Sequence, residues 1–205
     1  MGKIDPKHGL STLVNHIAEG ENPLHAHVSP IFQTSTFSFP DVATGVAIWK
    51  GEVPGYIYTR MDNPNLEQLA HKYAALEGLD LLRAQPDANP DELVAGMVFG
   101  SGMAAITSAI LACVKSGDTI IAMEALYGAT FTFLHDMAPQ YGIQVVWVHD
   151  PTPESWEQAF REHPKARLAY AETPANPTMT IVDLAALAET AHRYGAWLMV
   201  DNTFV

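Results

Sequence analysis

Apolar and polar positions follow no regular period over the first 64 residues of the chain. This segment is rich in turn-forming and aromatic residues, as in the run NPLHAHVSPIFQTSTFSFPD, and such runs indicate irregular backbone. We predict an extended N-terminal arm over residues 1–64, with short pieces of structure. Because an arm of this kind packs poorly by itself, we expect it to lie against another subunit.

The pattern becomes regular at residue 65. The run NLEQLAHKYAALEG places leucines and a tyrosine on one face and ends at Gly78, which predicts an amphipathic helix. The polar, proline-bearing run LDLLRAQPDANPDE follows it and predicts a surface loop.

Short apolar runs then alternate with helical segments. Strands are predicted for ELVAGMVF, DTIIAM, IQVVWV, RLAYAE and AWLMV, with helices beginning near Gly102, Gly128, Glu154 and Asp183. Runs that are apolar on both faces suit a mostly parallel sheet covered by helices on both sides. We therefore predict an α/β domain over residues 65–205.

In open α/β sheets, ligands bind at the carboxyl ends of the strands. Four stretches follow predicted strands directly, and we expect a site among them: Gly100–Met103, Glu124–Gly128, Glu172–Asn176 and Asp201–Thr203.

The first stretch can be interpreted as a dinucleotide site. Gly100, Gly102 and Ala105 match the fingerprint G-x-G-x-x-A, and Glu124 follows the next strand, where a ribose-binding acid would lie. An NAD-dependent oxidoreductase is therefore one hypothesis. A Rossmann unit usually opens its domain, however, whereas this one would follow an arm and a helix.

The same stretch can instead bind a single phosphate. The backbone N–H groups of Ser101, Gly102 and Met103 would then face the anion at a helix N-terminus, where unpaired donors and the helix dipole favour negative charge. A plain turn with a capping serine remains a further interpretation.

Polar and aromatic side chains elsewhere fit the phosphate hypothesis. Asp201 could pair with a protonated ring nitrogen, Tyr127 could stack on a planar cofactor, and Asn176 could bind a cofactor oxygen. Tyr58 and Arg60 lie two residues apart, as in a phosphate clamp. Each residue also has a purely structural interpretation, as a turn, a cap or a packed side chain. Together they fit one phosphorylated aromatic cofactor.

Charge and composition narrow the function classes. The formal net charge of −12 disfavours nucleic acid and anionic membranes as partners. The single cysteine, Cys113, allows no internal disulfide, and without a signal peptide or membrane span we expect a cytoplasmic protein. His25 and His27 lack further ligands nearby, so we predict no metal site.

Five motifs resemble the Cys/Met-metabolism family of pyridoxal-phosphate enzymes, which includes methionine γ-lyase, cystathionine γ-lyase, cystathionine γ-synthase and O-acetylhomoserine sulfhydrylase. They are YTRMDNPN, GSGMAAI, LYGATFTFLHD, AETPANPTM and VDNTF, in the family's order between residues 29 and 205. The resemblance implies an aspartate-aminotransferase-like (fold type I) large domain, pyridoxal 5'-phosphate as the cofactor, and a homo-oligomer, at least a dimer and commonly a tetramer.

The resemblance also implies how the phosphate is bound. By motif match, Ser101, Gly102 and Met103 would bind it from the same subunit. Tyr58 and Arg60 would reach it from the neighbouring subunit, which gives the irregular arm a function.

The remaining site residues follow in the same way. Tyr127 would stack on the ring and assist proton transfer, Asn176 would contact the ring oxygen, and Asp201 the pyridine nitrogen. The family's Schiff-base lysine lies in a Ser-x-Thr-Lys motif beyond that aspartate, and no such motif occurs here. We therefore expect the N-terminal part of a longer enzyme, without its C-terminal domain; a non-catalytic truncated subunit is the alternative.

The implied reaction is elimination or replacement at the γ-carbon of sulfur-containing or O-acylated amino acids. STFSFP and PANP favour the γ-lyase branch, whereas GYIYTRMDNPN and VDNTF favour the sulfhydrylase branch. Ala129 follows the LYG motif, where methionine γ-lyases typically have cysteine, and the polar insert at 85–91 is unusual for either branch.

Overall fold

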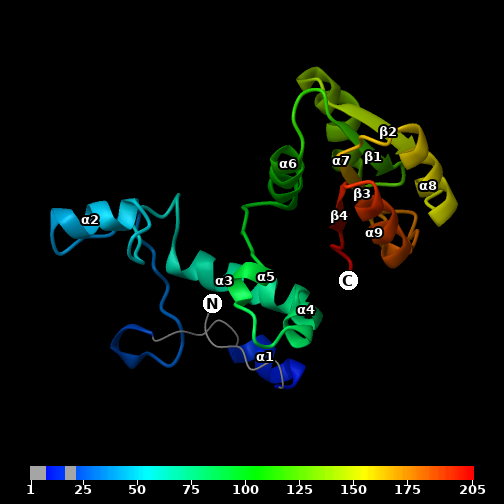
Figure 1. Cartoon of the computed structure of the whole chain (residues 1–205). Helices are drawn as coiled ribbons and strands as arrows, with labels where there is room; N and C mark the ends of the chain where they lie inside the picture. The colour runs from blue at the N-terminus through cyan, green and yellow to red at the C-terminus, as the bar shows by residue number, and fades with distance from the viewer. Residues whose placement is uncertain (1–7, 17–21) are drawn as a thin grey trace. The chain divides into compact units, whose positions relative to one another are not determined.

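The computed structural model describes residues 8–16 and 22–205, and the chain divides into two units, Met1–Val98 and Phe99–Val205 (Figure 1). Each unit is described by itself. Within the described ranges, no helix has the length and apolar character needed to cross a membrane. The N-terminal arm over residues 1–64 was predicted to lie against a neighbouring subunit, and this stays a prediction.

The second unit is built on a parallel sheet. Among the described residues its strands are β1 Thr119–Met123, β2 Gln144–Val148, β3 Leu168–Glu172 and β4 Trp197–Asp201. They lie in the order β2-β1-β3-β4, and each neighbouring pair is parallel. These are the strands predicted from DTIIAM, IQVVWV, RLAYAE and AWLMV.

Helices cover both faces of this sheet. They are α6 Gly102–Cys113, α7 Gly128–Thr132, continued by η2 Phe133–Met137 and η3 Ala138–Tyr141, then α8 Pro153–Glu162 and α9 Leu184–Arg193. The connection from β1 to β2 runs toward the β2 edge of the sheet. The connections from β2 to β3 and from β3 to β4 run toward the β4 edge. Right-handed crossovers therefore place α7 on one face and α8 and α9 on the other. Accordingly α6 contacts α7, and α8 contacts α9 (Figure 1).

The core of the second unit lies between the central strands and their helices. β3 is buried throughout and β1 over its last four residues, whereas β2 and β4 are partly exposed. From the helices, Trp156, Phe160 and Leu187 are almost fully buried against them. This burial pattern explains why the strands read as continuous apolar runs.

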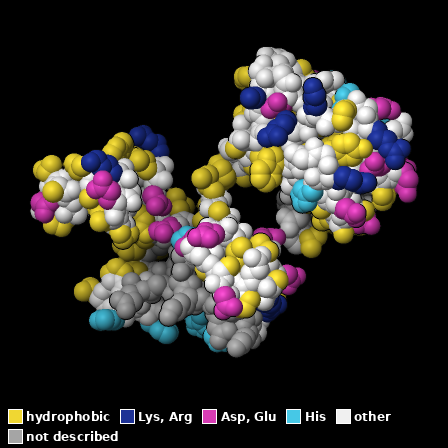
Figure 2. Space-filling view, viewed as in Figure 1, with side chains coloured by type: hydrophobic (Ala, Val, Ile, Leu, Met, Phe, Trp, Pro, Cys, Tyr) yellow, Lys and Arg dark blue, Asp and Glu magenta, His cyan; other side chains and the backbone are white. Residues whose placement is uncertain are grey.

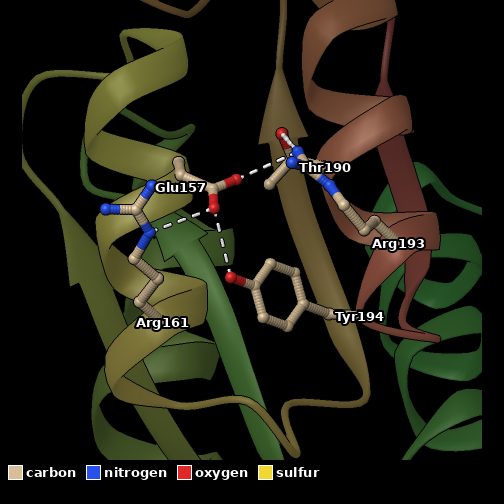
Figure 3. A network of polar contacts seen from close by, with 5 residues as sticks. All are labelled: Glu157, Arg161, Thr190, Arg193 and Tyr194. Carbon is tan, nitrogen blue, oxygen red and sulfur yellow. Dashed lines mark hydrogen bonds and ion pairs between the residues drawn. The ribbon is translucent and has the colours of Figure 1, made fainter.

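Glu157 links α8 to α9 on the outside of the sheet (Figure 3). Its carboxylate accepts hydrogen bonds from Arg193 at 3.0 Å and from the Tyr194 hydroxyl at 3.1 Å. It also accepts from Arg161 on its own helix at 3.2 Å. The Glu157 side chain is only 21% exposed, whereas both arginine side chains are more than half exposed.

Replacing Glu157 with alanine is expected to lower the free energy of unfolding by about 1–2 kcal/mol, because the bonds between the two helices are lost. Urea unfolding measures the change. Glu189→Ala, an exposed position on α9, is the control and should change little. Equal stability of the two variants would contradict the prediction.

The first unit consists of helices joined by irregular segments and has a small core. Its described helices are α1 Leu10–His16, η1 Pro23–His25, α2 Val42–Trp49, α3 Pro64–Glu77, α4 Leu79–Ala84 and α5 Pro90–Leu93. α3 confirms the helix predicted from residue 65. The buried cluster consists of Leu13, Ala75, Leu79 and Leu82.

Two sequence predictions in this unit are wrong. The expected surface loop after α3 contains α4 and α5, because Leu79 and Leu82 share one helical face and bury it. The expected strand ELVAGMVF is absent. Its first residues belong to α5, which Asn89 caps by accepting from the Asp91 N–H, and Val94 then packs on the cluster instead of pairing in a sheet.

Gly96 lies directly against α3 in this segment. A Cβ at this position would come within 2.2 Å of the Ala70 carbonyl oxygen, which is helix backbone that cannot move aside easily. Gly96→Ala is therefore expected to lower the free energy of unfolding by about 1–3 kcal/mol. Thermal unfolding measures the change, with Gly100→Ala as the control because a Cβ at that position meets nothing within 4 Å. Similar melting temperatures for the two variants would refute the prediction.

Candidate functional site

A pocket of about 350 Å³ opens at the carboxyl edge of the sheet in the second unit. Its walls come from the start of α6, from the segment after β1, and from the ends of β3 and β4 with the segments that follow them. Chain connections leave β1 and β3 in opposite directions across the sheet, so the pocket lies at the switch point where α/β folds bind ligands. Six of the predicted residues line it: Ser101, Gly102, Met103, Tyr127, Asn176 and Asp201.

The start of α6 contributes unpaired donors to this pocket. Ser101 is extended, with φ −160° and ψ 158°, and its hydroxyl caps the helix by accepting from the Ala104 N–H at 3.2 Å. The N–H groups of Gly102 and Met103 donate to no residue in the described part of the chain. Such a helix start binds anions through these donors and the helix dipole.

Asp201 ends β4 and lies beside Glu172 in the register of β3 and β4. One carboxylate oxygen, Oδ1, accepts from the backbone N–H of Thr203 at 3.2 Å and from the hydroxyl of the same residue. The sequence-based prediction gave Thr203 no role of its own. Thr203 thus orients the carboxylate through Oδ1. Oδ2 accepts from none of the residues that the structure describes, so it can bind a ligand.

Tyr170 belongs to β3 and lies two residues before the carboxyl end of that strand. It is almost fully buried, and with Asp201 it lines an adjoining pocket of about 250 Å³. Burial, and after it the negative charge of Asp201, raises the pKa of Tyr170 above its ordinary value. The phenol therefore keeps its proton at all physiological pH values.

Tyr127 and Asn176 face the pocket from the loops after β1 and β3. Tyr127 is the residue before α7, and its side chain is 46% exposed. Asn176 is partly buried, and its side-chain amide bonds to none of the residues that the structure describes. Both backbone N–H groups donate to one carboxylate, that of Glu172, at 2.7 Å each.

Tyr58 and Arg60 belong to the first unit. The Arg60 guanidinium carbon lies 4.8 Å from the centre of the Tyr58 ring, and both residues line a separate open pocket of about 830 Å³. Tyr58 also forms an antiparallel bridge with Thr36. The pair is therefore held together locally, and its predicted contact with a neighbouring subunit's cofactor stays a prediction.

The dinucleotide hypothesis lacks its structural context. The fingerprint requires a strand before the glycine turn, and residues 94–99 form none. Glu124, the expected ribose-binding acid, bonds instead to His149 with 2.6 Å between Oε2 and Nδ1, and it does not line the pocket. No group of three potential metal-binding side chains occurs among the described residues.

Comparison with known proteins identifies the family. The model of the Cys/Met metabolism PLP-dependent enzymes matches residues 11–205. The chain belongs to this family. The resemblance seen in the sequence motifs is thereby confirmed.

Relatives within the family carry different activities in their names. The chain is 42% identical to an L-methionine gamma-lyase of Porphyromonas gingivalis, over 96% of this chain and 45% of that protein. It is 33% identical to an O-succinylhomoserine sulfhydrylase of Pseudomonas aeruginosa, over 95% of this chain and 44% of the relative. The chain thus spans less than half the length of these relatives.

The fold is that of the large domain of fold type I enzymes. The crystal structure of metB from Corynebacterium glutamicum superposes with a TM-score of 0.79 at 28% identity, covering 97% of this chain and 46% of that one. The predicted α/β fold class is confirmed.

The pocket fits the cofactor on which this family depends. Pyridoxal phosphate needs an anion site, an aromatic neighbour and an acid for its ring nitrogen. The structure supplies N–H groups at the start of α6, the half-exposed ring of Tyr127 and the Asp201 carboxylate, all lining the same pocket; within the described ranges, those N–H groups and Oδ2 of Asp201 have no hydrogen-bond partner.

Proposed function

We propose that this chain is part of an enzyme that eliminates or replaces the γ-substituent of sulfur-containing or O-acylated amino acids. The observation that carries the proposal is the pocket itself, where a helix N-terminus, an aromatic ring and an acid converge. When bound, pyridoxal phosphate supplies an electron sink for negative charge that develops next to the amino group.

The residues that line the pocket have distinct tasks in this proposal. The backbone N–H groups of Ser101, Gly102 and Met103 bind the phosphate, and the side-chain amide of Asn176 contacts the ring oxygen. The Asp201 carboxylate, oriented by Thr203, holds a proton on the ring nitrogen through Oδ2. Tyr127 covers one face of the ring, and its hydroxyl is available for proton transfer close to the substrate.

Methionine and related thioethers are the favoured substrates, with loss of the γ-substituent to water. Support comes from the 42% identity to a methionine gamma-lyase. One feature of the chain disfavours methionine as the substrate: Ala129 stands where methionine γ-lyases typically have cysteine. The alternative is a transferase that adds sulfide or a thiol, supported by the 33% identity to a sulfhydrylase.

We further propose that the enzyme is a cytoplasmic homo-oligomer in which Tyr58 and Arg60 reach the neighbouring subunit's phosphate. The first unit exposes many large apolar side chains (Figure 2), among them Ile31, Val42 and Trp49, which are 87%, 83% and 66% exposed. Apolar surface of this extent is typical of a subunit interface.

Cofactor addition to the full-length protein tests the proposal. We expect a visible absorbance band after addition of pyridoxal phosphate, and release of a 2-oxo acid from methionine or cystathionine. Formation of homocysteine from O-acetylhomoserine and sulfide would assign the transferase alternative. Absence of the band, or saturable binding of NADH instead, would refute the proposal.

A further inference from the structure

Glu172 carries a buried carboxylate at the end of β3. It is 4% exposed, and no Lys, Arg or His in the described ranges forms an ion pair with it. Burying a charged group in this way is costly unless hydrogen bonds replace the water it has lost. The hydrogen-bond partners of the Glu172 carboxylate therefore indicate its role.

Both carboxylate oxygens accept from backbone N–H groups. Oε2 accepts from the N–H of Tyr127 and Oε1 from that of Asn176, each at 2.7 Å. These are short, charge-assisted hydrogen bonds. One partner lies in the loop after β1 and the other in the loop after β3, so a single side chain joins the two loops that flank the switch point.

The position of Glu172 is itself fixed. It is the last residue of β3, buried throughout, and its own N–H donates to the Met123 sulfur at the end of β1. The carboxylate thus projects from the end of a fully buried strand toward Tyr127 and Asn176, which both lie outside the strands.

We infer that Glu172 is a positioning residue that clamps these loops together and thereby sets where the Tyr127 ring and the Asn176 amide face the pocket. Its effect on cofactor binding rests on the proposed function, whereas the clamp is a property of the chain alone. The role requires two acceptor oxygens. Glutamine has the same size but presents an NH₂ group to one of the two N–H donors, so one bond must break.

Hydrogen exchange in the cofactor-free, full-length protein tests the clamp directly. In Glu172→Gln, the amide of Tyr127 or Asn176 is expected to exchange roughly tenfold faster or more, because a bond to a charged acceptor is lost. Amides of β1 and β3 should keep their protection. Glu124→Gln is the matched control: it removes a carboxylate charge from the segment after β1, and that carboxylate bonds to His149 and to neither loop amide.

Two results would overturn the inference. One is unchanged exchange at both loop amides in Glu172→Gln. The other is faster exchange throughout β1 and β3, which would mean that the residue supports the sheet as a whole. If the glutamine variant does not fold, Glu172→Asp, which keeps both oxygens but is one methylene shorter, takes its place with the same expected results.

The consequence for the site is measured separately. Glu172→Gln should weaken pyridoxal phosphate binding roughly tenfold, and less than tenfold when Asn176→Ala is already present, because the clamp acts partly through that residue. Fully additive losses would contradict action through Asn176. Failure of the unmodified protein to bind the cofactor would refute the proposed function and leave the exchange result intact.

Discussion

Asparagine at position 201 is expected to lower kcat/KM of the full-length enzyme by roughly 10- to 1,000-fold while leaving the protein folded. An opposite charge close to a titrating group shifts its pKa by about 1–3 units, and each unit corresponds to about 1.4 kcal/mol. Without the Asp201 carboxylate, the pKa of the pyridine nitrogen of bound pyridoxal phosphate would fall. The ring would then carry a proton less often and would stabilise negative charge on the substrate less well.

The asparagine variant preserves the local hydrogen bonds. Its side-chain oxygen can still accept from the backbone N–H and hydroxyl of Thr203, so only the charge is removed. Asp150→Asn is the control, because Asp150 is exposed after β2 and does not line the pocket. Product release by the two variants at several pH values gives the comparison. If Asp201→Asn retained full activity, the proposed pairing with the ring nitrogen would be wrong.

Much of the second unit could be predicted from the sequence because its central strands are buried on both faces. RLAYAE and DTIIAM are continuous apolar runs for this reason. Polar residues directly after such runs stand out, and Tyr127, Asn176 and Asp201 were found in this way. The rule that ligands bind at strand ends then placed them together, and the pocket they line agrees with it.

ELVAGMVF shows where the pattern misleads. A short apolar run bounded by turn formers is equally typical of a strand and of an extended segment packed on a helix. Here Pro90 and Asn89 start a short helix, and Gly96 allows close approach to Ala70. The sequence of this segment does not reveal that α3 will pack against it. The choice between a strand and an extended segment therefore depends on tertiary contacts.

Glu172 and Thr203 were missed for a related reason. Their roles are hydrogen bonds whose partners the sequence does not mark, since any residue has a backbone N–H. Tyr127 is 45 positions from Glu172 along the chain. An acidic residue at the end of a fully apolar strand was the available signal, because such a charge requires partners.

Proline at position 102 is expected to weaken pyridoxal phosphate binding by roughly 10- to 100-fold, because it removes one of the unpaired N–H groups proposed to bind the phosphate. The substitution suits the local backbone. Gly102 is the first residue of α6, where proline is tolerated because that N–H makes no bond within the helix. Ser101 before it is extended, as a residue preceding proline prefers.

Gly102→Ala is the matched comparison, since alanine keeps the N–H and its Cβ would meet no atom within 4 Å. The dissociation constant for pyridoxal phosphate, measured by fluorescence titration of the full-length protein, should therefore rise much more for proline than for alanine. Circular dichroism should show the same helix content in both variants. Equal affinities would mean that the phosphate does not use this donor, and the anion site would then have to lie away from the start of α6.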